Sequence, residues 1–353
     1  MPSSWVLHVD MDQFVAAVEV LRDPSLAGLP VVVGGRGDPT QRGVVSTASY
    51  EARAFGVGSG MPLRTAARKL PDDAVFLPVD GPLYIEASEQ VMTVLRSFGA
   101  TDGAVVEVLG WDEAFVGVDG DDPEALARAI QAAVLERTRL HCSIGIGQTK
   151  VMAKTATSFG KPQGVFTITA ETWFEIMGSR PTDALWGVGR KTSAKLDALG
   201  FRTVSQLATA PTETLVARLG PTMGPWYRRI ARGGDLSPVT STPRVARGHG
   251  RETTFQENLC DWEQVEQEVR ALAYRVLEDV VAEGRPAVRV GLKVRYAPFE
   301  SHTASTPLPE PTFAELEIAD AAAALLARFD ATRAVRLLGV RLEMSPPEGG
   351  YPR

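Results

Sequence analysis

The chain has 353 residues, of which 44% are hydrophobic, and a formal net charge of -6. This length suits two to four domains with buried cores. No apolar run approaches the roughly 18 residues that a membrane-spanning helix needs, and the start, "MPSSWVLHVD", is unlike a secretory signal. Its only cysteines, Cys142 and Cys260, lack metal-ligand spacing, so we expect neither a disulfide framework nor a structural zinc site, but two buried, reduced thiols in a cytoplasmic protein with no membrane partner.

The net charge hides an asymmetry along the chain. Between Ala184 and Arg251 there are eleven basic and three acidic residues, a net charge of +8, which leaves -14 for the rest. Because phosphate binding is driven largely by Lys and Arg, this segregation predicts one region that faces a polyanion beside an acidic body. A solvated basic helical face is the alternative interpretation.

The first half reads as a mixed α/β unit. Short apolar runs predict buried strands, and 3.6-residue periodicity predicts helices between them. The Gly-rich segment 34–43 interrupts this pattern as a turn. Two β-rich runs in 104–120 meet near Gly110 and Trp111, which indicates a hairpin or a bulged strand pair. The predicted strands are 5–9, 30–33 and 141–147, and the predicted helices are 13–22, 63–70, 81–99, 122–138 and 149–159.

The second half contains two further modules. From about residue 183 the pattern consists of short helices, each closed by Gly or Pro, and predicts a compact all-helical module. Residues 236–246, "LSPVTSTPRVA", predict a linker, and 347–353 a disordered tail. Between them the order βαββαβ is expected, with strands at 251–256, 287–296, 301–307 and 334–343 and helices at 261–284 and 312–329.

Two acids follow the first strand. In "LHVDMDQF", Asp10 and Asp12 lie where a buried strand ends and a helix begins, the position at which open α/β sheets usually hold ligands. Asp12 has two open interpretations, an N-cap of the helix or part of a site. Asp10 is harder to explain structurally, because a carboxylate close to the core is costly unless it is paired or metal-bound.

A second acidic pair interrupts an apolar β segment in "WDEAF". In a regular strand Asp112 and Glu113 would point to opposite faces, so both could reach one site only at a bulge or turn, which Gly110 makes plausible. Three carboxylates converging from two strand ends suit hard divalent cations such as Mg²⁺, and two such ions can activate an attacking oxygen and stabilise a leaving one.

Candidate anion-binding groups follow. "STASYEAR" offers Thr47, Tyr50 and Arg53, and on a helical turn the last two would share a face that suits a triphosphate. Lys161, in "GKPQG", lies where Pro162 must end a helix and could also reach phosphate. Surface roles are the alternative for each residue taken alone.

"LWGVGRKTSAKLDALG" carries a helix-hairpin-helix pattern. The turn Gly187-Val188-Gly189 would expose backbone N–H groups beside a helix N-terminus, with Lys191 and Thr192 adjacent. Such a turn grips a phosphate backbone without reading bases. A nucleotide P-loop is excluded because the lysine in "GIGQTKV" is followed by a valine.

Taken together, these motifs resemble those of the Y-family DNA polymerases of the DinB (DNA polymerase IV) type. The resemblance runs through nearly the whole chain, in "HVDMDQF", "GVVSTASYEARAFGVGSGMP", "DEAFVGV", "CSIGIGQTKVMAKTATSFGKPQG", "LWGVGRKTSAKLDALG" and "RLLGVRL". It implies a right-hand polymerase of multidomain α/β (α+β) class. The implied parts are a mixed α/β palm (1–12 and 80–168), small fingers (13–79), an all-helical thumb (169–235), the linker 236–246 and a βαββαβ little finger (247–346).

The resemblance also implies roles for individual residues. Asp10 and Asp112 would hold two Mg²⁺ ions, with Mn²⁺ a possible substitute, Glu113 would complete the site near the primer 3′-OH, and the Met11 carbonyl would ligate the nucleotide-side ion. The reaction would be in-line attack of the primer 3′-oxygen on the α-phosphorus of a dNTP. The triphosphate would contact Thr47, Tyr50, Arg53 and Lys161; the sugar would lie on Phe14 and Val15; and primer-template DNA would contact Gly187, Val188, Gly189, Lys191, Thr192, Arg247, Arg251 and Arg336.

The chain departs from the family pattern at three places. Gly110-Trp111 replaces a usual Ser-Leu before the acidic pair, and the tail "EMSPPEGGYPR" lacks the usual clamp-binding peptide, so we expect no conventional C-terminal sliding-clamp contact. Val15 stands where relatives have Phe or Tyr, whose ring blocks a ribose 2′-OH. Valine leaves that space open, which predicts incorporation of ribonucleotides; closure of the gap by another side chain is the alternative.

Two other functions compete with a translesion polymerase that works as a monomer. The first is a non-catalytic DNA-binding protein that uses the helix-hairpin-helix and little finger. The intact set of predicted site residues argues against it: Asp10, Asp112, Glu113, Tyr50, Arg53 and Lys161. The second is a nucleotidyltransferase that acts without a template, which the long DNA-tracking module and the linker argue against.

Overall fold

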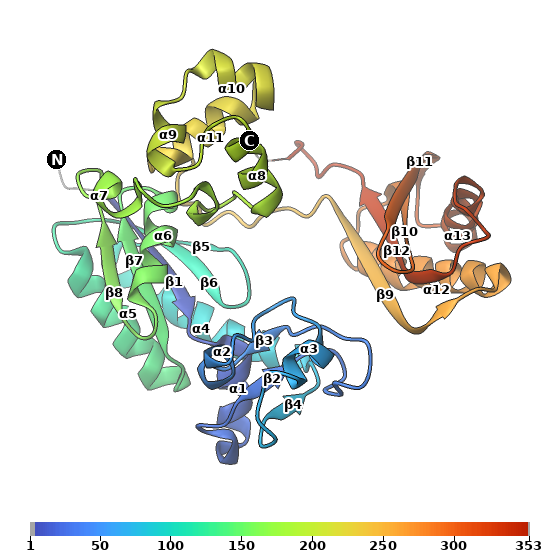
Figure 1. Ribbon diagram of the computed structural model, residues 1–353, viewed down its shortest axis with the longest axis horizontal. Coiled ribbons are helices and arrows are strands. Elements are labelled where there is room, and N and C mark those ends of the chain that lie inside the picture. The colour runs from blue at the N-terminus through green and yellow to red at the C-terminus, as the bar shows by residue number, and fades with distance from the viewer. Residues whose placement is uncertain (1–3, 352–353) are drawn as a thin grey trace. The chain divides into compact units, whose positions relative to one another are not determined.

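The computed structural model describes residues 4–351. Their contacts divide the chain into two compact units, with the break between Pro243 and Arg244, except that Thr40–Arg42 groups with the second unit. Figure 1 shows both. No helix within residues 4–351 combines the length and the apolar character that crossing a bilayer requires.

A five-stranded sheet, here called the central sheet, organises the first unit. Its strand order is β5-β6-β1-β7-β8, with β7 and β8 parallel and the other neighbours antiparallel. Helices α4 and α5 pack on the sheet, and α6 packs against β1, β7 and β8. The elements are β1 (Ser4–Met11), α1 (Phe14–Arg22), α4 (Gly81–Asp102), β5 (Val105–Val108), β6 (Glu113–Asp119), α5 (Pro123–Thr138), β7 (Cys142–Gly147), α6 (Lys150–Gly160) and β8 (Val165–Ile168).

A small sheet of order β3-β2-β4 lies between α1 and α4 in the sequence. It has its own compact core, built around Val32, Ala52 and Leu63. α1, by contrast, turns Phe14, Val15 and Val18 into the core of the central sheet. The elements are η1 (Pro24–Leu26), β2 (Val31–Val33), β3 (Thr47–Ala48), α2 (Tyr50–Ala54), α3 (Leu63–Ala67) and β4 (Val75–Leu77).

Short helices follow the central sheet and form the helical module. Trp173 is fully buried in its core, and its indole N–H donates to the Ala231 carbonyl at 2.9 Å, so the first and last helices are tied together. The elements are α7 (Trp173–Met177), η2 (Thr182–Ala184), α8 (Arg190–Ala198), α9 (Val204–Thr209), α10 (Thr212–Leu219) and α11 (Met223–Ala231).

The second unit is an antiparallel sheet of order β11-β10-β12-β9 with helices packed on one face. Alternate residues of β10 and β12 are buried against the helices, as period-2 geometry requires. The elements are β9 (Gly248–Leu259), α12 (Trp262–Ala282), β10 (Ala287–Tyr296), β11 (Ser301–Thr312), α13 (Glu315–Ala324), η3 (Leu325–Arg328) and β12 (Val335–Met344).

The cysteine prediction is half right. Both thiols are free, and Cys142 on β7 is buried, where burial raises its pKa to about 12. Cys260 is exposed. It lies in the turn between β9 and the start of α12, and a turn presents its side chains to solvent.

Candidate functional site

Strand β1 sorts its side chains between two faces. Leu7, Val9 and Met11 belong to the hydrophobic core that α4 and α5 complete, whereas the intervening residues His8 and Asp10 point to the opposite face, which α6 covers. The alternation follows from the period of two in a strand. It brings Asp10 out of the core at the carboxyl end of β1, as the sequence predicts.

Three carboxylates meet at this end of the central sheet. Asp10 on β1 pairs in register with Glu113, the first residue of β6. Asp112 precedes it in the loop that joins β5 to β6, and the carbonyl of Asp112 accepts from the Met11 N–H at 2.8 Å. The irregularity expected near Gly110 is therefore a hairpin loop. It lets Asp112 and Glu113 approach Asp10 together.

The electrostatics of the three carboxylates differ. Burial, followed by the charges of Asp10 and Glu113, raises the pKa of Asp112. Glu113 shows the opposite effect, because its hydrogen bond with His8 and then its contact with Lys154 lower its pKa to about 2. Like charges crowded this closely attract cations.

The ammonium groups of two lysines lie beside these carboxylates. Lys161, just after α6, forms an ion pair with Asp10, and Lys154, within α6, forms one with Glu113. Side-chain atoms of His8, Asp10 and Glu113 that can ligate a metal lie within 4.8 Å of one another; the predicted ligand Asp112 is not part of this group, and His8, which was not predicted, is. The carboxylate oxygens are hard donors that fit Mg²⁺ or Mn²⁺, so the chemistry of the donor set suits the metal that the sequence predicts.

Asp12 is a buried support and not a helix cap. The N-cap residue of α1 is Gln13, which has a left-handed backbone. The Asp12 carboxylate, 4% exposed, accepts hydrogen bonds from the Tyr50 hydroxyl (2.7 Å), the Ser143 hydroxyl (2.9 Å) and the Gln163 N–H (2.8 Å). It thereby connects α2, β7 and the segment after Lys161. The cap interpretation is wrong, because the chain turns one residue later than a cap at Asp12 would need.

Three of the predicted anion-binding residues lie on β3 and α2. Tyr50 and Arg53 share a face of α2, and the Arg53 guanidinium lies 4.9 Å from the centre of the Tyr50 ring. The backbone N–H of Tyr50 donates to the Gln13 side chain at 2.5 Å, which fixes the start of α2 near the end of β1. Thr47 lies on β3, three residues before Tyr50. Burial and the hydrogen bond to Asp12 raise the pKa of Tyr50, so its hydroxyl stays protonated.

Phe14 and Val15 open helix α1. Phe14 is 2% exposed and Val15 is 9% exposed. α1 packs against β3, the strand that carries Thr47. Val15 itself is buried in the core of the central sheet.

The helix-hairpin-helix turn has the geometry that glycine allows. Gly187 has a φ of +87°, and a Cβ there would lie 2.6 Å from the Trp226 ring. Gly189 is exposed and is the N-cap of α8, beside the exposed Lys191 and the half-buried Thr192. Val188 is buried in the core of the helical module, so only its backbone could meet a ligand. The first helix of the motif is a three-residue 3-10 turn, η2.

The three predicted arginines of the second unit each contact a different neighbour. Arg251 makes a bidentate ion pair with Asp279 on α12, at 2.7 and 2.8 Å. Arg247 lies over the ring of Tyr351, at 4.9 Å, and Arg336 over that of Phe299, at 4.5 Å.

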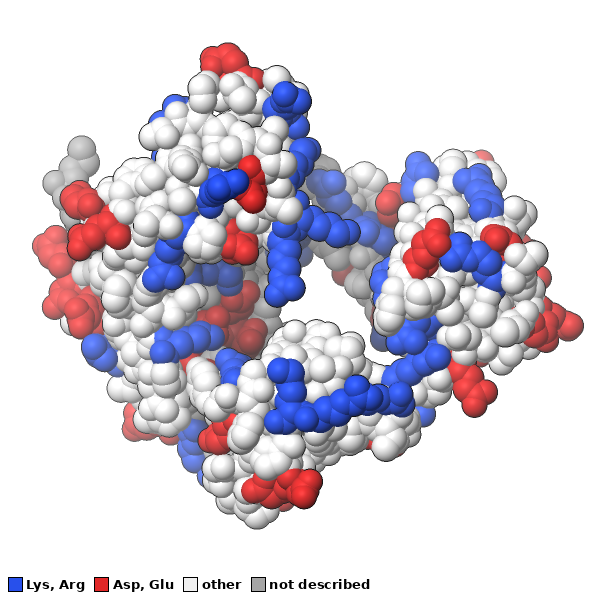
Figure 2. Space-filling view, viewed as in Figure 1, with Lys and Arg blue, Asp and Glu red and all other residues white. Residues whose placement is uncertain are grey.

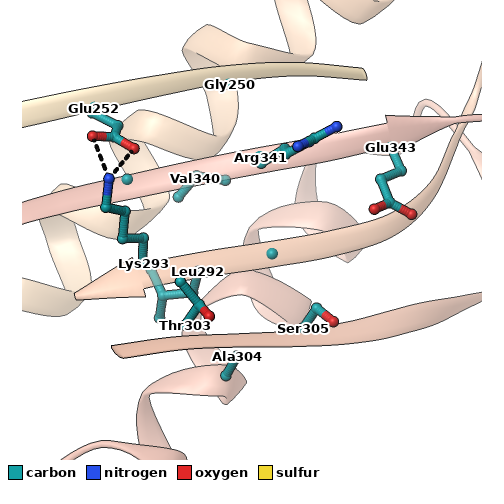
Figure 3. A pocket seen from close by; sticks show the side chains of 12 residues that line it. Gly250, Glu252, Leu292, Lys293, Thr303, Ala304, Ser305, Val340, Arg341 and Glu343 are labelled. Carbon is teal, nitrogen blue, oxygen red and sulfur yellow. Dashed lines mark hydrogen bonds and ion pairs between the residues drawn. The ribbon is translucent and has the colours of Figure 1, made fainter. Parts of the chain in front are cut away.

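A groove of about 790 Å³ crosses the face of this sheet that the helices leave open (Figure 3). Arg341 stands in register between Gly250 and Gly291. Lys293 reaches across Gly339 to Glu252, at 2.8 Å. The contact is possible because Gly339 has no Cβ, which would collide with the Glu252 side chain. Arg341 was not predicted; its position in "RLLGVRL" gives no signal without the register of the sheet.

In the space-filling view basic side chains lie along the helical module and also form a row over the region of the small sheet, and acidic ones gather over the region of the central sheet (Figure 2). The basic side chains of the helical module agree with the charge asymmetry of the sequence, whereas the row over the small sheet lies outside that basic segment. The residues that sequence reasoning missed in the site are His8 and Lys154. The signal for His8 was its position two residues before Asp10, on the same strand face.

Family models and individual relatives match this chain over most of its length. Residues 9–158 match the model of the impB/mucB/samB family, and residues 246–350 match that of the impB/mucB/samB family C-terminal domain. The chain is 46% identical to DNA polymerase IV 2 of Mycobacterium tuberculosis over 345 residues, covering 97% of this chain and 98% of the relative. It is 40% identical to DNA polymerase IV of Methanoculleus marisnigri over 355 residues, covering 99% and 96%.

Two solved structures are similar in fold. A Y-family DNA polymerase chimera superposes with a TM-score of 0.82, at 24% identity, over 96% of this chain and 98% of the chimera. DinB from Sulfolobus solfataricus superposes with a TM-score of 0.61, at 24% identity and the same coverage.

Proposed function

The chain belongs to the impB/mucB/samB family, as a Y-family DNA polymerase of the DinB type, and we propose that it extends a DNA primer by template-directed nucleotidyl transfer with two divalent cations. The observation that carries the proposal is the register pairing of Asp10 with Glu113, with Asp112 beside them in the hairpin loop. That arrangement would supply three hard ligands at one strand end.

Asp10, Asp112 and Glu113 would hold Mg²⁺, or Mn²⁺ in its place, and the Met11 carbonyl would add a ligand. Such ions lower the pKa of an attacking hydroxyl and neutralise phosphate charge. The chain's own contribution is positioning. The pairing of β1 with β6 fixes Asp10 against Glu113, and the Met11–Asp112 hydrogen bond fixes the loop.

Lys161, Tyr50 and Arg53 would bind the triphosphate, with Thr47 alongside. The Lys161 side chain is 28% exposed, so its ammonium can leave Asp10 for a phosphate oxygen. Tyr50 has a single hydroxyl proton, which it donates to Asp12 at 2.7 Å. Binding a phosphate would redirect that proton, and Asp12 would keep its hydrogen bonds from Ser143 and Gln163.

Primer-template DNA would lie along the helix-hairpin-helix and the second unit. The exposed N–H groups at Gly187 and Gly189, together with Lys191 and Thr192, suit a sugar-phosphate backbone. Arg247, Arg251 and Arg336 stay candidates for template phosphates, with Arg251 having to leave Asp279 to serve. One chain supplies every group in this scheme, so a monomer suffices.

Ribonucleotides would also be substrates, because Val15 replaces an aromatic ring at the sugar position. Val15 has no atoms beyond its γ-carbons, and together with its neighbour Phe14 it would form the floor of the sugar pocket. Deoxyribonucleotides would remain the preferred substrates.

The test is primer extension on a defined template with each set of four nucleotides. We expect extension that follows the template and requires Mg²⁺ or Mn²⁺, and loss of about 100-fold or more of the rate in Asp112→Ala. With ribonucleotides, the wild type should add several residues, and Val15→Phe should reject them while it keeps most of its rate with deoxyribonucleotides.

Each part of the proposal has its own contradicting result. Extension that ignores the template sequence, or none at all, would contradict the polymerase. Strong discrimination against ribonucleotides by the wild type would contradict the role of Val15 alone. A circular dichroism spectrum and melting temperature for each variant control for folding.

A further inference from the structure

The Lys154 ammonium has three neighbours: Glu113, His8 and Trp186. It contacts the Glu113 carboxylate, lies 3.1 Å from His8 Nε2, and lies 5.6 Å from the centre of the Trp186 ring. His8 Nε2 is also 3.2 Å from the Glu113 carboxylate, so His8 contacts both members of the ion pair. The Lys154 side chain is only 20% exposed.

His8 and Trp186 are themselves fixed. His8 is 1% exposed, and its Nδ1 lies 2.9 Å from the hydroxyl of Thr157, one turn beyond Lys154 on α6. The Trp186 ring packs edge-on against Phe115 at 6.0 Å. An ammonium between such partners keeps one position, unlike a lysine on an open surface.

The second lysine at the carboxylates has a different setting. Lys161 ends α6 as its C-cap, and its side chain is more exposed than that of Lys154. A lysine side chain at the end of a helix can move its ammonium group more freely than one within the helix, such as Lys154. The two lysines therefore suit different tasks, one mobile and one fixed.

We propose that Lys154 is a positioning residue for Glu113, and that its charge also weakens divalent-cation binding at the three carboxylates before nucleotide arrives. This proposal rests on the proposed function. By holding one carboxylate oxygen, Lys154 leaves the other directed towards the site. By placing a positive charge beside the ligands, it opposes a second cation there.

Trp186 ties this contact to the DNA-binding turn, because it is the residue before Gly187. Its ring touches two elements of the central sheet's site, Phe115 on β6 and Lys154 on α6. The position of the Lys154 ammonium thus depends on the helical module as well as on the sheet.

The experiment compares Lys154→Met with Lys150→Met in the full-length protein. Lys150 lies one turn earlier on α6, is 5% exposed, pairs with Glu107 at 2.6 Å and lies 5.5 Å from the Phe115 ring. It is a matched control for loss of a buried lysine from the same helix. Mn²⁺ binding is measured without DNA or nucleotide by electron paramagnetic resonance, and kcat and KM are measured by primer extension.

For Lys154→Met we expect Mn²⁺ to bind about tenfold more tightly, because an opposing charge is gone. We also expect kcat to fall by about 10- to 100-fold as Glu113 loses its fixed partner, with KM for dNTP changed less than about threefold. Lys154→Arg should return Mn²⁺ affinity to the wild-type value. Lys150→Met should lower the melting temperature yet leave Mn²⁺ affinity and kcat within about twofold of wild type.

Three results would overturn the proposal. Unchanged Mn²⁺ affinity in Lys154→Met would remove the charge effect. A raised KM with kcat preserved would make Lys154 a substrate contact instead. Equal effects of Lys154→Met and Lys150→Met would leave only a structural role.

A second variant covers the case in which Lys154→Met does not fold. Trp186→Leu changes a side chain that is 41% exposed, and we expect a smaller fall in kcat with DNA affinity retained; an unchanged kcat would contradict the role of the ring. Because Mn²⁺ binding is read without catalysis, these results can be separated from failure of the polymerase proposal, which would appear in the wild type.

Discussion

The ionisation of Glu113 depends on its neighbours. The hydrogen bond with His8 and the Lys154 ammonium lower its pKa from 4.5 to about 2. A carboxyl whose pKa is lowered by folding stabilises the folded state at a pH above its unfolded value, and that stability is lost as the pH falls towards the folded value. The relevant window is therefore about pH 5 to pH 2.

We expect this single group to account for about 2 kcal/mol of unfolding free energy lost between pH 6 and pH 3. Urea unfolding at both values, in the wild type and in Glu113→Gln, measures it. The difference in stability between the two proteins should shrink on acidification. A constant difference would show that Glu113 titrates normally in the folded protein.

The sequence predicted the acids of this cluster but not their counter-charges. Asp10 and the Asp112-Glu113 pair interrupt apolar strands, which makes them visible in a single sequence. Lys154 is one of several lysines in the segment 150–161, and nothing in its spacing marks it. Only the packing of α6 over β1 brings its ammonium to Glu113, 41 residues away in the chain.

At the scale of elements, α6 lies unusually close to β7. A Cβ on Gly145 would stand 2.0 Å from the Ala153 carbonyl and 2.2 Å from the Thr157 N–H. These are backbone atoms of the helix and cannot rotate aside. The glycine at this strand position is what lets α6 carry Lys154 to the carboxylates.

Gly145→Ala should therefore destabilise the protein by about 3 kcal/mol or more, since overpacking against backbone forces the helix away from the sheet. Gly120→Ala is the matched control, because a Cβ there would meet no atom within 4 Å. Thermal melting compares the two. Equal melting temperatures would mean that α6 can shift freely.

One strand boundary was predicted wrongly because an edge strand tolerates proline. The strand predicted at 301–307 continues to Thr312 as β11, through Pro307, Pro309 and Pro311. Proline removes an N–H, so sequence rules end a strand there. β11 is at the edge of its sheet, and its outer N–H groups have no strand to bond. Helix α13 then begins at Glu315 instead of the predicted 312.

At the scale of the whole molecule, the net charge of -6 would disfavour DNA if charge were spread evenly. The segment from Ala184 to Arg251 has a net charge of +8, and this local positive charge favours contact with a polyanion in spite of the negative total. The fold class, the carboxylates at the end of β1 and this asymmetry could all be inferred from sequence. The partners of individual arginines could not, because pairs such as Arg251 with Asp279 depend on tertiary packing.

We expect DNA affinity to fall steeply with salt, with a slope of log K against log salt of about -3 or steeper, because counterions are released from several phosphates. Fluorescence anisotropy with a labelled primer-template measures the slope. The double variant Arg190→Ala, Lys191→Ala should make it shallower by about 1 to 2. A slope near zero would mean that the basic segment does not contact phosphates.

The alternation on β1 has an evolutionary consequence. Because Leu7, Val9 and Met11 fill the core while His8 and Asp10 serve the opposite face, one inserted or deleted residue in this strand would exchange the two sets. The carboxylate would enter the apolar interior and a leucine or valine would replace it at the site. A change of length in β1 would therefore disrupt both faces at once, whereas a substitution on one face leaves the other in place.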